Sequence, residues 1–226
     1  MSNELNVDEA KANLLGDFLG EMAKDRPGEV LRMSDEGIHG DFEVIPTGAL
    51  SLDVALGAGG FPKGRIVELF GPEMSGKTSL ALSVAANTQA QGGNVGFVDA
   101  EHALSQKHAS DFGVDLDRVA IFQPNSGEEG IEMVEKMVRS GAFDMIIVDS
   151  VAAMVPQAEI DAEVSQQHMA LHARLMSKFM RRISGYVADH NVCLVLINQI
   201  RTDLGAYGAP STTPGGKAIK FYSSVR

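Results

Sequence analysis

The chain has only one cysteine among its 226 residues, and no apolar run approaches the roughly 20 residues that a membrane-spanning helix needs. Cys193 lies in the apolar run Val192 to Ile197, so it cannot form an intramolecular disulfide and is expected to pack as a small hydrophobe. No N-terminal stretch has the basic, apolar and small-residue segments of a signal peptide. These absences predict a soluble protein in a reducing cytoplasm.

Internal repeats and low-complexity tracts are also absent, and the 44% hydrophobic and 22% charged residues are ordinary for a folded domain. The length suits one large α/β domain with a small appendage. Between Val7 and Arg26, apolar residues recur at helical spacing, and Pro27 and Gly28 then break the pattern. We expect an N-terminal helix and linker over residues 1–37, covering its apolar face on its own core or on a neighbouring subunit, and a core domain over residues 38–226.

The net charge of −11 is unevenly distributed. Residues 168–226 carry eight basic and two acidic side chains, whereas the rest of the chain is strongly acidic. In the expected helix from His168 to Asp189, apolar residues follow one side and four cations the other: Arg174, Lys178, Arg181 and Arg182. A polyanion can dock on such a patch, although a solvated basic face is the simpler interpretation. His168 and His172 lie four apart, but no third ligand supports a metal site there.

Short apolar runs alternate with helical patterns from Arg65 onward, which predicts an α/β fold with a mostly parallel central sheet flanked by helices. The runs are Ile66 to Phe70, Val95 to Val98, Met145 to Val148 and Val192 to Ile197. The helical stretches are Lys77 to Gln91, Gly127 to Arg139 and His168 to Asp189. Ligands bind at the carboxyl ends of parallel strands, so the polar residues that follow the runs should converge on one site.

The first run leads into a complete phosphate-binding loop, G-x-x-x-x-G-K-[ST], directly before a predicted helix. Its glycines allow the backbone amides to approach phosphate oxygens, and its lysine adds a cation near the β and γ phosphates. The threonine hydroxyl should bind Mg²⁺. The loop consists of Gly71, Pro72, Glu73, Met74, Ser75, Gly76, Lys77 and Thr78.

Three further strand ends offer the remaining chemistry of ATP hydrolysis. Asp149 is expected to hold Mg²⁺ through a water. Glu101 and Asp99 compete for the role of general base, and spacing alone does not separate them. Gln199 is able to hydrogen-bond the γ-phosphate and report which nucleotide is bound, or it is simply a polar strand terminus.

The chain resembles the bacterial RecA recombinase family over nearly its whole length. The residues that carry the resemblance are Thr47 to Asp53, Ala55 to Gly60, Gly71 to Thr78, Asp99 to Leu104, Val148 to Ala153, Asn198 to Arg201 and Lys220 to Tyr222. The resemblance implies that Glu101 activates the water, that Gln199 senses the γ-phosphate, and that Thr78 and Asp149 serve Mg²⁺. It also implies nucleotide contacts from Ser79, Ser105 and His108.

The resemblance further implies two DNA-binding loops, at about Gln157 to His168 and Ile200 to Lys217. Met169 and Leu204 match positions that insert between base steps, a role suited to apolar wedges. The other implied DNA contacts should hold phosphates rather than read bases. They are Arg174, Ser177, Arg181, Arg201, Gly215, Gly216 and Lys217.

Departures from the family pattern concern both nucleotide binding and the turnover of ATP. His108 stands where the family has a tyrosine against adenine, and Ser105 where it has an aspartate. The match stops at Arg226, in an expected strand, before the family's C-terminal lobe and the lysine pair that a neighbouring subunit supplies to the γ-phosphate. We expect weaker or less selective nucleotide binding, in a chain that is either a fragment or a natural short form.

The function that fits these patterns is an ATP- and Mg²⁺-dependent DNA recombinase of recombination and repair. It would form helical filaments on single-stranded DNA and promote pairing and strand exchange with double-stranded DNA. One alternative is a helicase or repair ATPase with the same core. Another is a nucleotide-gated filament module that binds without turnover.

Overall fold

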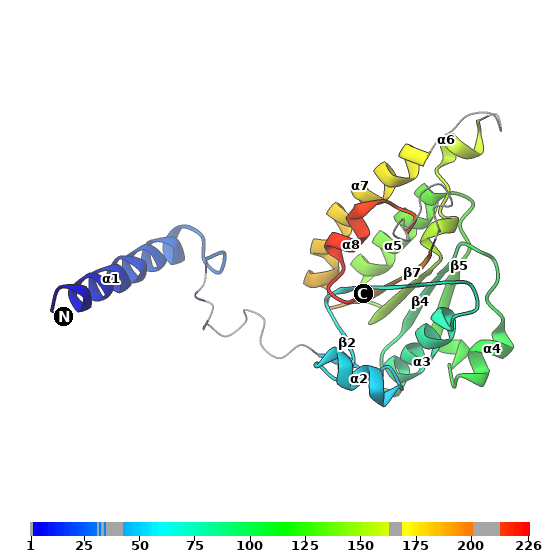
Figure 1. Ribbon diagram of the computed structural model, residues 1–226, viewed down its shortest axis with the longest axis horizontal. Helices are drawn as coiled ribbons and strands as arrows, with labels where there is room; N and C mark the ends of the chain where they lie inside the picture. The colour runs from blue at the N-terminus through cyan, green and yellow to red at the C-terminus, as the bar shows by residue number, and fades with distance from the viewer. Residues whose placement is uncertain (1, 31, 33, 35–42, 163–168, 201–212) are drawn as a thin grey trace, which may run out of the picture. The chain divides into compact units, whose positions relative to one another are not determined.

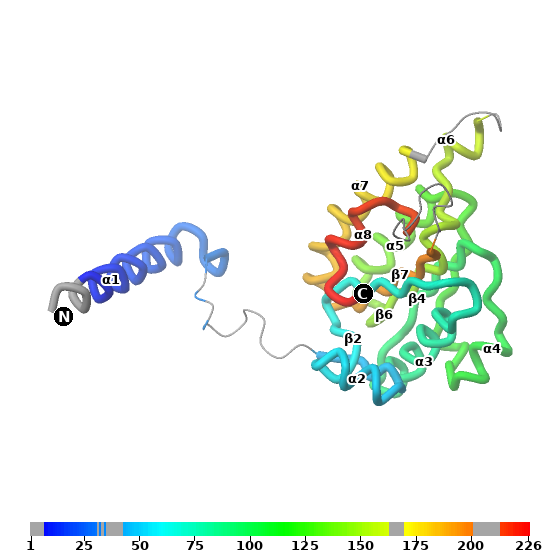
Figure 2. Tube along the Cα trace, viewed as in Figure 1, coloured from blue at the N-terminus to red at the C-terminus, as the bar shows by residue number. Residues whose placement is uncertain are grey.

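The computed structural model describes residues 2–30, 32, 34, 43–162, 169–200 and 213–226. The contacts within the chain divide it into two units, Met1–Phe42 and Glu43–Arg226. Figures 1 and 2 show the chain coloured from its N-terminus to its C-terminus. The domain boundary predicted after residue 37 lies outside the described residues. Among the helices that the structure describes, none has the length and apolar character that a bilayer crossing requires.

The first unit contains helix α1, Ser2–Asp25. It begins before the predicted start at Val7 and ends at the predicted break, where Gly28 adopts a positive φ of 82°. Leu14, Leu15 and Phe18 are each about half exposed or more.

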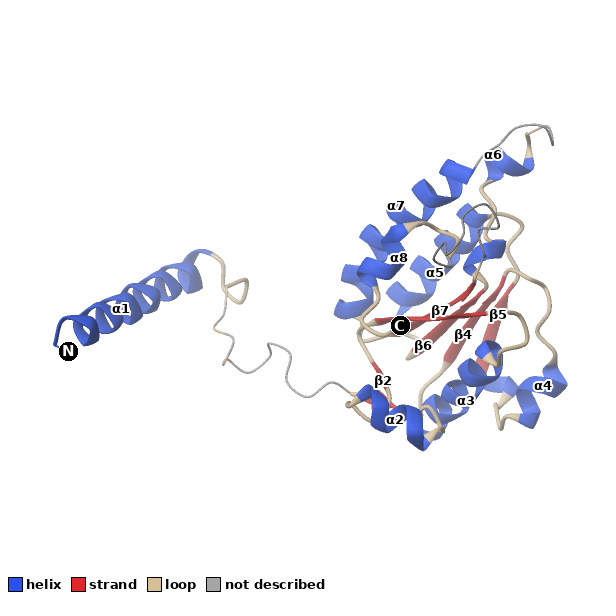
Figure 3. Cartoon of the chain, viewed as in Figure 1, coloured by secondary structure: helices blue, strands red, loops and turns tan. Residues whose placement is uncertain are grey.

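The second unit is built on the predicted parallel sheet. Five strands run in the order β3-β7-β6-β4-β5, and every neighbouring pair is parallel. Their bounds are Ile66–Gly71 for β3, Val95–Asp99 for β4, Val119–Phe122 for β5, Met145–Asp149 for β6 and Cys193–Gln199 for β7. The α/β prediction is confirmed, and Figure 3 shows the strands between layers of helices.

Both faces of the sheet are covered because successive side chains of a strand point to opposite sides. Met145 and Ile147 of β6 join the core under α3, whereas Ile146 and Val148 join the core under α5 and α7. The main helices are α3 (Lys77–Ala90), α4 (Gln106–Asp111), α5 (Gly127–Ser140), α7 (Met169–Asp189) and α8 (Lys217–Tyr222). Cys193 is fully buried, and burial raises the pKa of its thiol to about 12.

Several short elements had no clear sequence pattern. They are the antiparallel pair β1 (Val44–Ile45) and β2 (Phe61–Pro62), helices α2 (Leu50–Leu56) and α6 (Gln157–Ile160), and the 3₁₀ turns η1 (Leu116–Arg118) and η2 (Val151–Ala153). Near the C-terminus, Val225 forms a parallel bridge with Val67. The chain was expected to end at Arg226 within a sheet strand. The structure has one bridge to β3 at Val225 instead of a strand.

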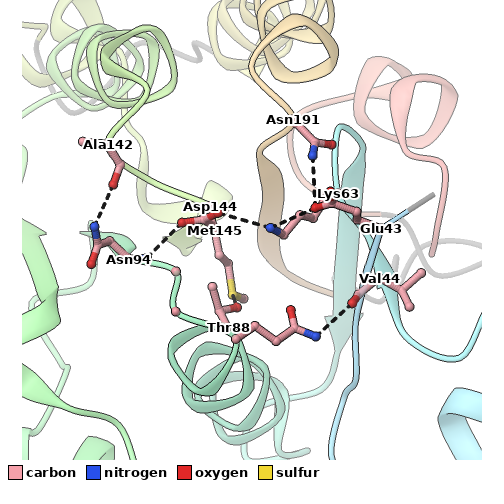
Figure 4. Close-up of polar contacts among 12 residues, drawn as sticks. Glu43, Val44, Lys63, Thr88, Asn94, Ala142, Asp144, Met145 and Asn191 are labelled. Atoms are coloured by element: carbon pink, nitrogen blue, oxygen red, sulfur yellow. Dashed lines mark hydrogen bonds and ion pairs between the residues drawn. The ribbon is translucent and has the colours of Figure 1, made fainter. Parts of the chain in front are cut away.

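A polar cluster lies around Lys63, beside the residues that directly precede β4 and β6 (Figure 4). The Lys63 ammonium pairs with Asp144 and with Glu43, both at 3.2 Å, and its side chain is only 14% exposed. Asp144 also accepts from the Asn94 amide at 3.0 Å, and Asn191 donates to Glu43 at 3.3 Å. These bonds fix the first residue of the second unit against the sheet.

Replacing Lys63 by methionine is expected to lower the free energy of unfolding by about 1–3 kcal/mol, because charge-assisted hydrogen bonds are lost in a largely buried place. Urea denaturation at pH 7 measures the change. The matched control is Lys136→Met, which breaks the exposed i,i+4 pair with Glu132 and should have no measurable effect. Equal stabilities of wild type and Lys63→Met would contradict the role assigned to the cluster.

The same pair has a defined pH dependence. Burial alone would lower the pKa of Lys63, but Asp144 and Glu43 outweigh it and raise the pKa above the ordinary value of 10.5. The stabilisation is therefore fully present below pH 10.5 and is lost as the pH rises through the raised folded-state pKa. The stability difference between wild type and Lys63→Met should be constant between pH 7 and 9.

Candidate nucleotide-binding site

The phosphate loop connects the end of β3 to the start of α3, as predicted. Gly76 has a φ of 87°, where an L side chain would be strained, and a Cβ at Gly71 would lie 2.9 Å from the Ser75 hydroxyl oxygen. The Lys77 ammonium donates to the carbonyl oxygens of Gly71 and Pro72, at 3.1 and 2.6 Å. The loop is therefore curled around its own lysine, in the shape that a phosphate chain requires.

The two candidate magnesium ligands lie in direct contact. The Thr78 hydroxyl donates to an Asp149 carboxylate oxygen at 2.7 Å, which joins the first turn of α3 to the end of β6. Burial raises the pKa of Asp149, the Thr78 bond opposes this, and the charges of Glu101 and Asp99 add to the rise. Hydroxyl and carboxylate oxygens are the ligands that Mg²⁺ prefers, and the cation would relieve the repulsion among these acids. The residues present fit the ion.

Glu101 is held by two donors from different strand ends. Ser150, just after β6, donates its hydroxyl to Glu101 Oε1, and Gln199 at the end of β7 donates to the same oxygen at 3.0 Å. The other oxygen, Oε2, makes no hydrogen bond to any residue that the structure describes. One side of the carboxylate is thus anchored, and the other is available to accept a proton.

Asp99, the competitor for the same role, is almost fully buried and already occupied. Its oxygens accept from the amides of Ala103 and Leu104, at 3.1 and 3.2 Å, and from Gln123 at 3.0 Å. These bonds shape the turn after β4. The geometry therefore favours Glu101 as the group that meets a water.

The predicted convergence of strand ends is observed. Lys77, Thr78, Glu101, Asp149 and Gln199 line one cavity of about 210 Å³. They come from α3 and from the ends of β4, β6 and β7, which share one edge of the sheet. Sequence reasoning assigned no role to Ser150, although its place beside Asp149 after a strand was the available signal.

A second cavity of about 180 Å³ shares Thr78, Glu101 and Asp149 with the first and adds Leu104 and His108. His108 Nε2 lies 3.4 Å from the Ser79 hydroxyl, and its ring meets Phe112 edge-on at 5.2 Å. Ser105 accepts from the His108 amide and caps α4. The three predicted nucleotide residues outside the loop are thus grouped beside the first cavity.

The predicted DNA-binding residues that the structure describes lie on another part of the unit. Arg174, Lys178 and Arg181 of α7 are exposed, whereas Arg182 pairs with Glu135 of α5 at 2.7 Å. The Ser177 hydroxyl donates to Ala173 O within the helix, at 2.8 Å. The Met169 side chain, Arg201 and Leu204 lie outside the described residues. The basic face is therefore narrower than the helical period indicated.

Two segments expected as loops contain helix. Gln157–Ile160 at the start of the first forms α6, and Lys217 at the end of the second begins α8. Gly215 and Gly216, with φ of 90° and 74°, form the turn before α8. This turn lines a cleft of about 360 Å³ with Glu159 and His172.

Comparison with known proteins agrees with this architecture. The model of the RecA N-terminal domain matches residues 19–226. A Protein RecA of Clostridium botulinum is 48% identical over 223 residues, covering 98% of this chain and 62% of the relative. The Protein RecA of Acholeplasma laidlawii is 50% identical over 200 residues, covering 88% and 60%, and that of Heliobacterium modesticaldum is 51% identical over 200 residues, covering 88% and 58%. The chain thus spans 58–62% of these relatives' length, and it belongs to the RecA family.

Proposed function

We propose that this chain is the core of a DNA-dependent ATPase and recombinase, which assembles into a helical filament on single-stranded DNA and promotes homologous pairing and strand exchange. The observation that carries the proposal is the double anchoring of Glu101 by Gln199 and Ser150, in the cavity that also holds Lys77. ATP hydrolysis requires a general base, a contact to the γ-phosphate and a phosphate-loop lysine close together, and this cavity has a candidate for each.

In this proposal the loop amides and Lys77 bind the phosphates of ATP. Thr78 and Asp149 would hold Mg²⁺, which would neutralise charge on the phosphate oxygens. Glu101 Oε2 takes a proton from a water. The water oxygen bonds to the γ-phosphorus while the bond to the β–γ bridging oxygen breaks, giving ADP and phosphate. Gln199 reaches the γ-phosphate by exchanging its bond to Glu101 for one to the nucleotide, so the two residues report the nucleotide state together.

DNA would be held through phosphates by the exposed cations of α7 and by Lys217. The +6 charge of residues 168–226 supports this on an otherwise acidic chain. A steep fall of DNA affinity with salt is expected, because each neutralised phosphate releases counterions. The exposed apolar residues of α1 support self-association onto a second copy. A cytoplasmic location accords with the single, fully buried thiol of Cys193.

The deciding experiment is strand exchange between a circular single strand and a homologous linear duplex, with ATP and Mg²⁺. The proposal predicts joint molecules with homologous partners and none with heterologous ones. Unwinding without homologous pairing would instead identify a helicase or repair ATPase. ATP binding and filaments without turnover or exchange would identify a nucleotide-gated module.

A further inference from the structure

Asn198 lies in the apolar strand β7, directly before Gln199, and is fully buried. Its amide nitrogen donates to Glu68 Oε1 and to the Pro214 carbonyl oxygen, both at 3.0 Å. Its amide oxygen accepts from the Gln199 backbone N–H, also at 3.0 Å. One side chain thus contacts the neighbouring strand, the candidate γ-phosphate sensor and the turn that leads into α8.

Glu68 provides a rigid anchor for this amide. It belongs to β3, the strand paired with β7, and its side chain has no exposed surface. Its second oxygen accepts from Arg226 Nε at 2.5 Å, and the Arg226 guanidinium lies 3.9 Å above the Phe70 ring. Both carboxylate oxygens therefore have partners, as a buried charge requires.

The orientation of the Asn198 amide is fixed by its partners. A carboxylate and a backbone carbonyl only accept, so the nitrogen must face both of them. A flipped amide would place its oxygen against two acceptors and leave the Gln199 N–H opposite a donor. The side chain therefore has only one orientation that satisfies all of its hydrogen bonds. A shift of the Gln199 backbone pulls on the amide oxygen, and the same rigid amide group holds Pro214 through its nitrogen.

The Pro214 carbonyl begins the turn of Gly215 and Gly216, which packs closely on α7. A Cβ at Gly215 would lie 3.2 Å from Met176, and one at Gly216 would lie 3.1 Å from Ala173. The turn therefore cannot shift without moving against the helix that carries the exposed arginines. Asn198 connects the nucleotide cavity to this surface through two hydrogen bonds.

We propose that Asn198, anchored by Glu68, is a positioning residue that couples the nucleotide contact of Gln199 to the Pro214–Gly216 turn, and so makes DNA affinity depend on the bound nucleotide. The inference rests on the proposed function and adds the residue pair that transmits the signal. The measurable quantity is the coupling factor, the ratio of the single-stranded DNA Kd without nucleotide to that with a non-hydrolysable ATP analogue. Couplings of this kind are typically about 5- to 150-fold.

Asn198→Asp is expected to bring the coupling factor to within about twofold of 1, since carboxylate oxygens replace the donor that faces Glu68 and Pro214. The affinity for the ATP analogue, measured separately, should change by less than about threefold, because Asn198 does not line the nucleotide cavity. The smaller, uncharged Asn198→Ser, which cannot reach either acceptor, is the second variant if the first does not fold. The matched control is Thr88→Val, which removes a buried hydroxyl that donates to Val84 O at 2.9 Å on α3 and should keep the wild-type factor.

The double variant Glu68→Gln with Asn198→Asp separates positioning from a merely structural role. The new amide at 68 can donate to the new carboxylate at 198, which restores that bond and part of the thermal stability, but not the bond to Pro214. We expect stability to rise above that of Asn198→Asp and coupling to stay lost. Recovery of both, or wild-type coupling in Asn198→Asp or Asn198→Ser, would overturn the inference alone. A coupling factor of 1 in the wild-type protein would overturn the proposed function as well.

Discussion

Replacing Glu101 by glutamine is expected to lower the rate of ATP hydrolysis by a factor of about 10²–10⁴, the usual contribution of a general base. Binding of ATP should stay within a few-fold of wild type. The glutamine oxygen can still accept from Ser150, and from Gln199 until Gln199 turns to the nucleotide, so the anchoring of the side chain is retained as in the wild type. What disappears is the free carboxylate oxygen that takes the proton from water.

Single-turnover hydrolysis, with nucleotide affinity titrated separately, distinguishes the two effects. The matched control is Glu132→Gln on α5, an exposed carboxylate that pairs with Lys136 outside the cavity. It should hydrolyse ATP at the wild-type rate. An unchanged hydrolysis rate in Glu101→Gln would mean that another residue is the general base. An absence of ATP hydrolysis already in the wild type would favour a module that binds nucleotide without turnover.

The sequence predicted the convergence of the strand ends on one cavity, because the determinants of that convergence are local. The phosphate loop is one continuous motif, and the residues after parallel strands must share one edge of the sheet. Spacing alone left Asp99 and Glu101 as equals, since Asp99 ends β4 and Glu101 follows two residues later, and only the family resemblance favoured Glu101. Their difference lies in tertiary contacts, because Asp99 turns inward to Gln123 and two amides, whereas Glu101 meets residues from β6 and β7.

Edge elements and long-range polar pairs were harder to predict. β5 is an apolar run of only four residues, which the sequence analysis did not single out, and it lies at the sheet edge with Ala120 and Ile121 exposed. Lys63 and Asp144 are 81 residues apart, and no periodic pattern relates them. Glu68, inside the first apolar run, was an unused signal, since a carboxylate there must find a buried partner.

Helical periodicity also had a limit on α7. It placed Arg174, Lys178, Arg181 and Arg182 on one face, but it could not show that Glu135 of α5 pairs with the last of them. A cation that is neutralised by its own fold contributes less to a polyanion site. The described structure therefore leaves Arg174, Lys178 and Arg181 as the candidates on this helix for holding a polyanion.

Replacing Lys77 by alanine is expected to weaken ATP binding by about 10- to 150-fold, which corresponds to the roughly 1.5–3 kcal/mol of a hydrogen bond to a charged group. The Lys77 ammonium is bonded to carbonyl oxygens of the loop, one of them on the exposed Pro72. Water can replace it there, and the Thr78–Asp149 bond is untouched. The unfolding free energy should therefore change by less than about 0.5 kcal/mol.

Titration with a fluorescent ATP analogue and urea denaturation measure the two quantities. The matched control is Lys107→Ala on α4, which removes the same charge from an exposed pair with Asp111 and should bind the analogue as wild type does. Because exposed charges are screened beyond about 8–10 Å at physiological salt, a loss confined to Lys77→Ala reports direct contact with phosphate. Equal losses in both variants would mean that the cavity attracts nucleotide by its general field, and a loss of stability in Lys77→Ala would mean that the lysine holds the loop together rather than the ligand.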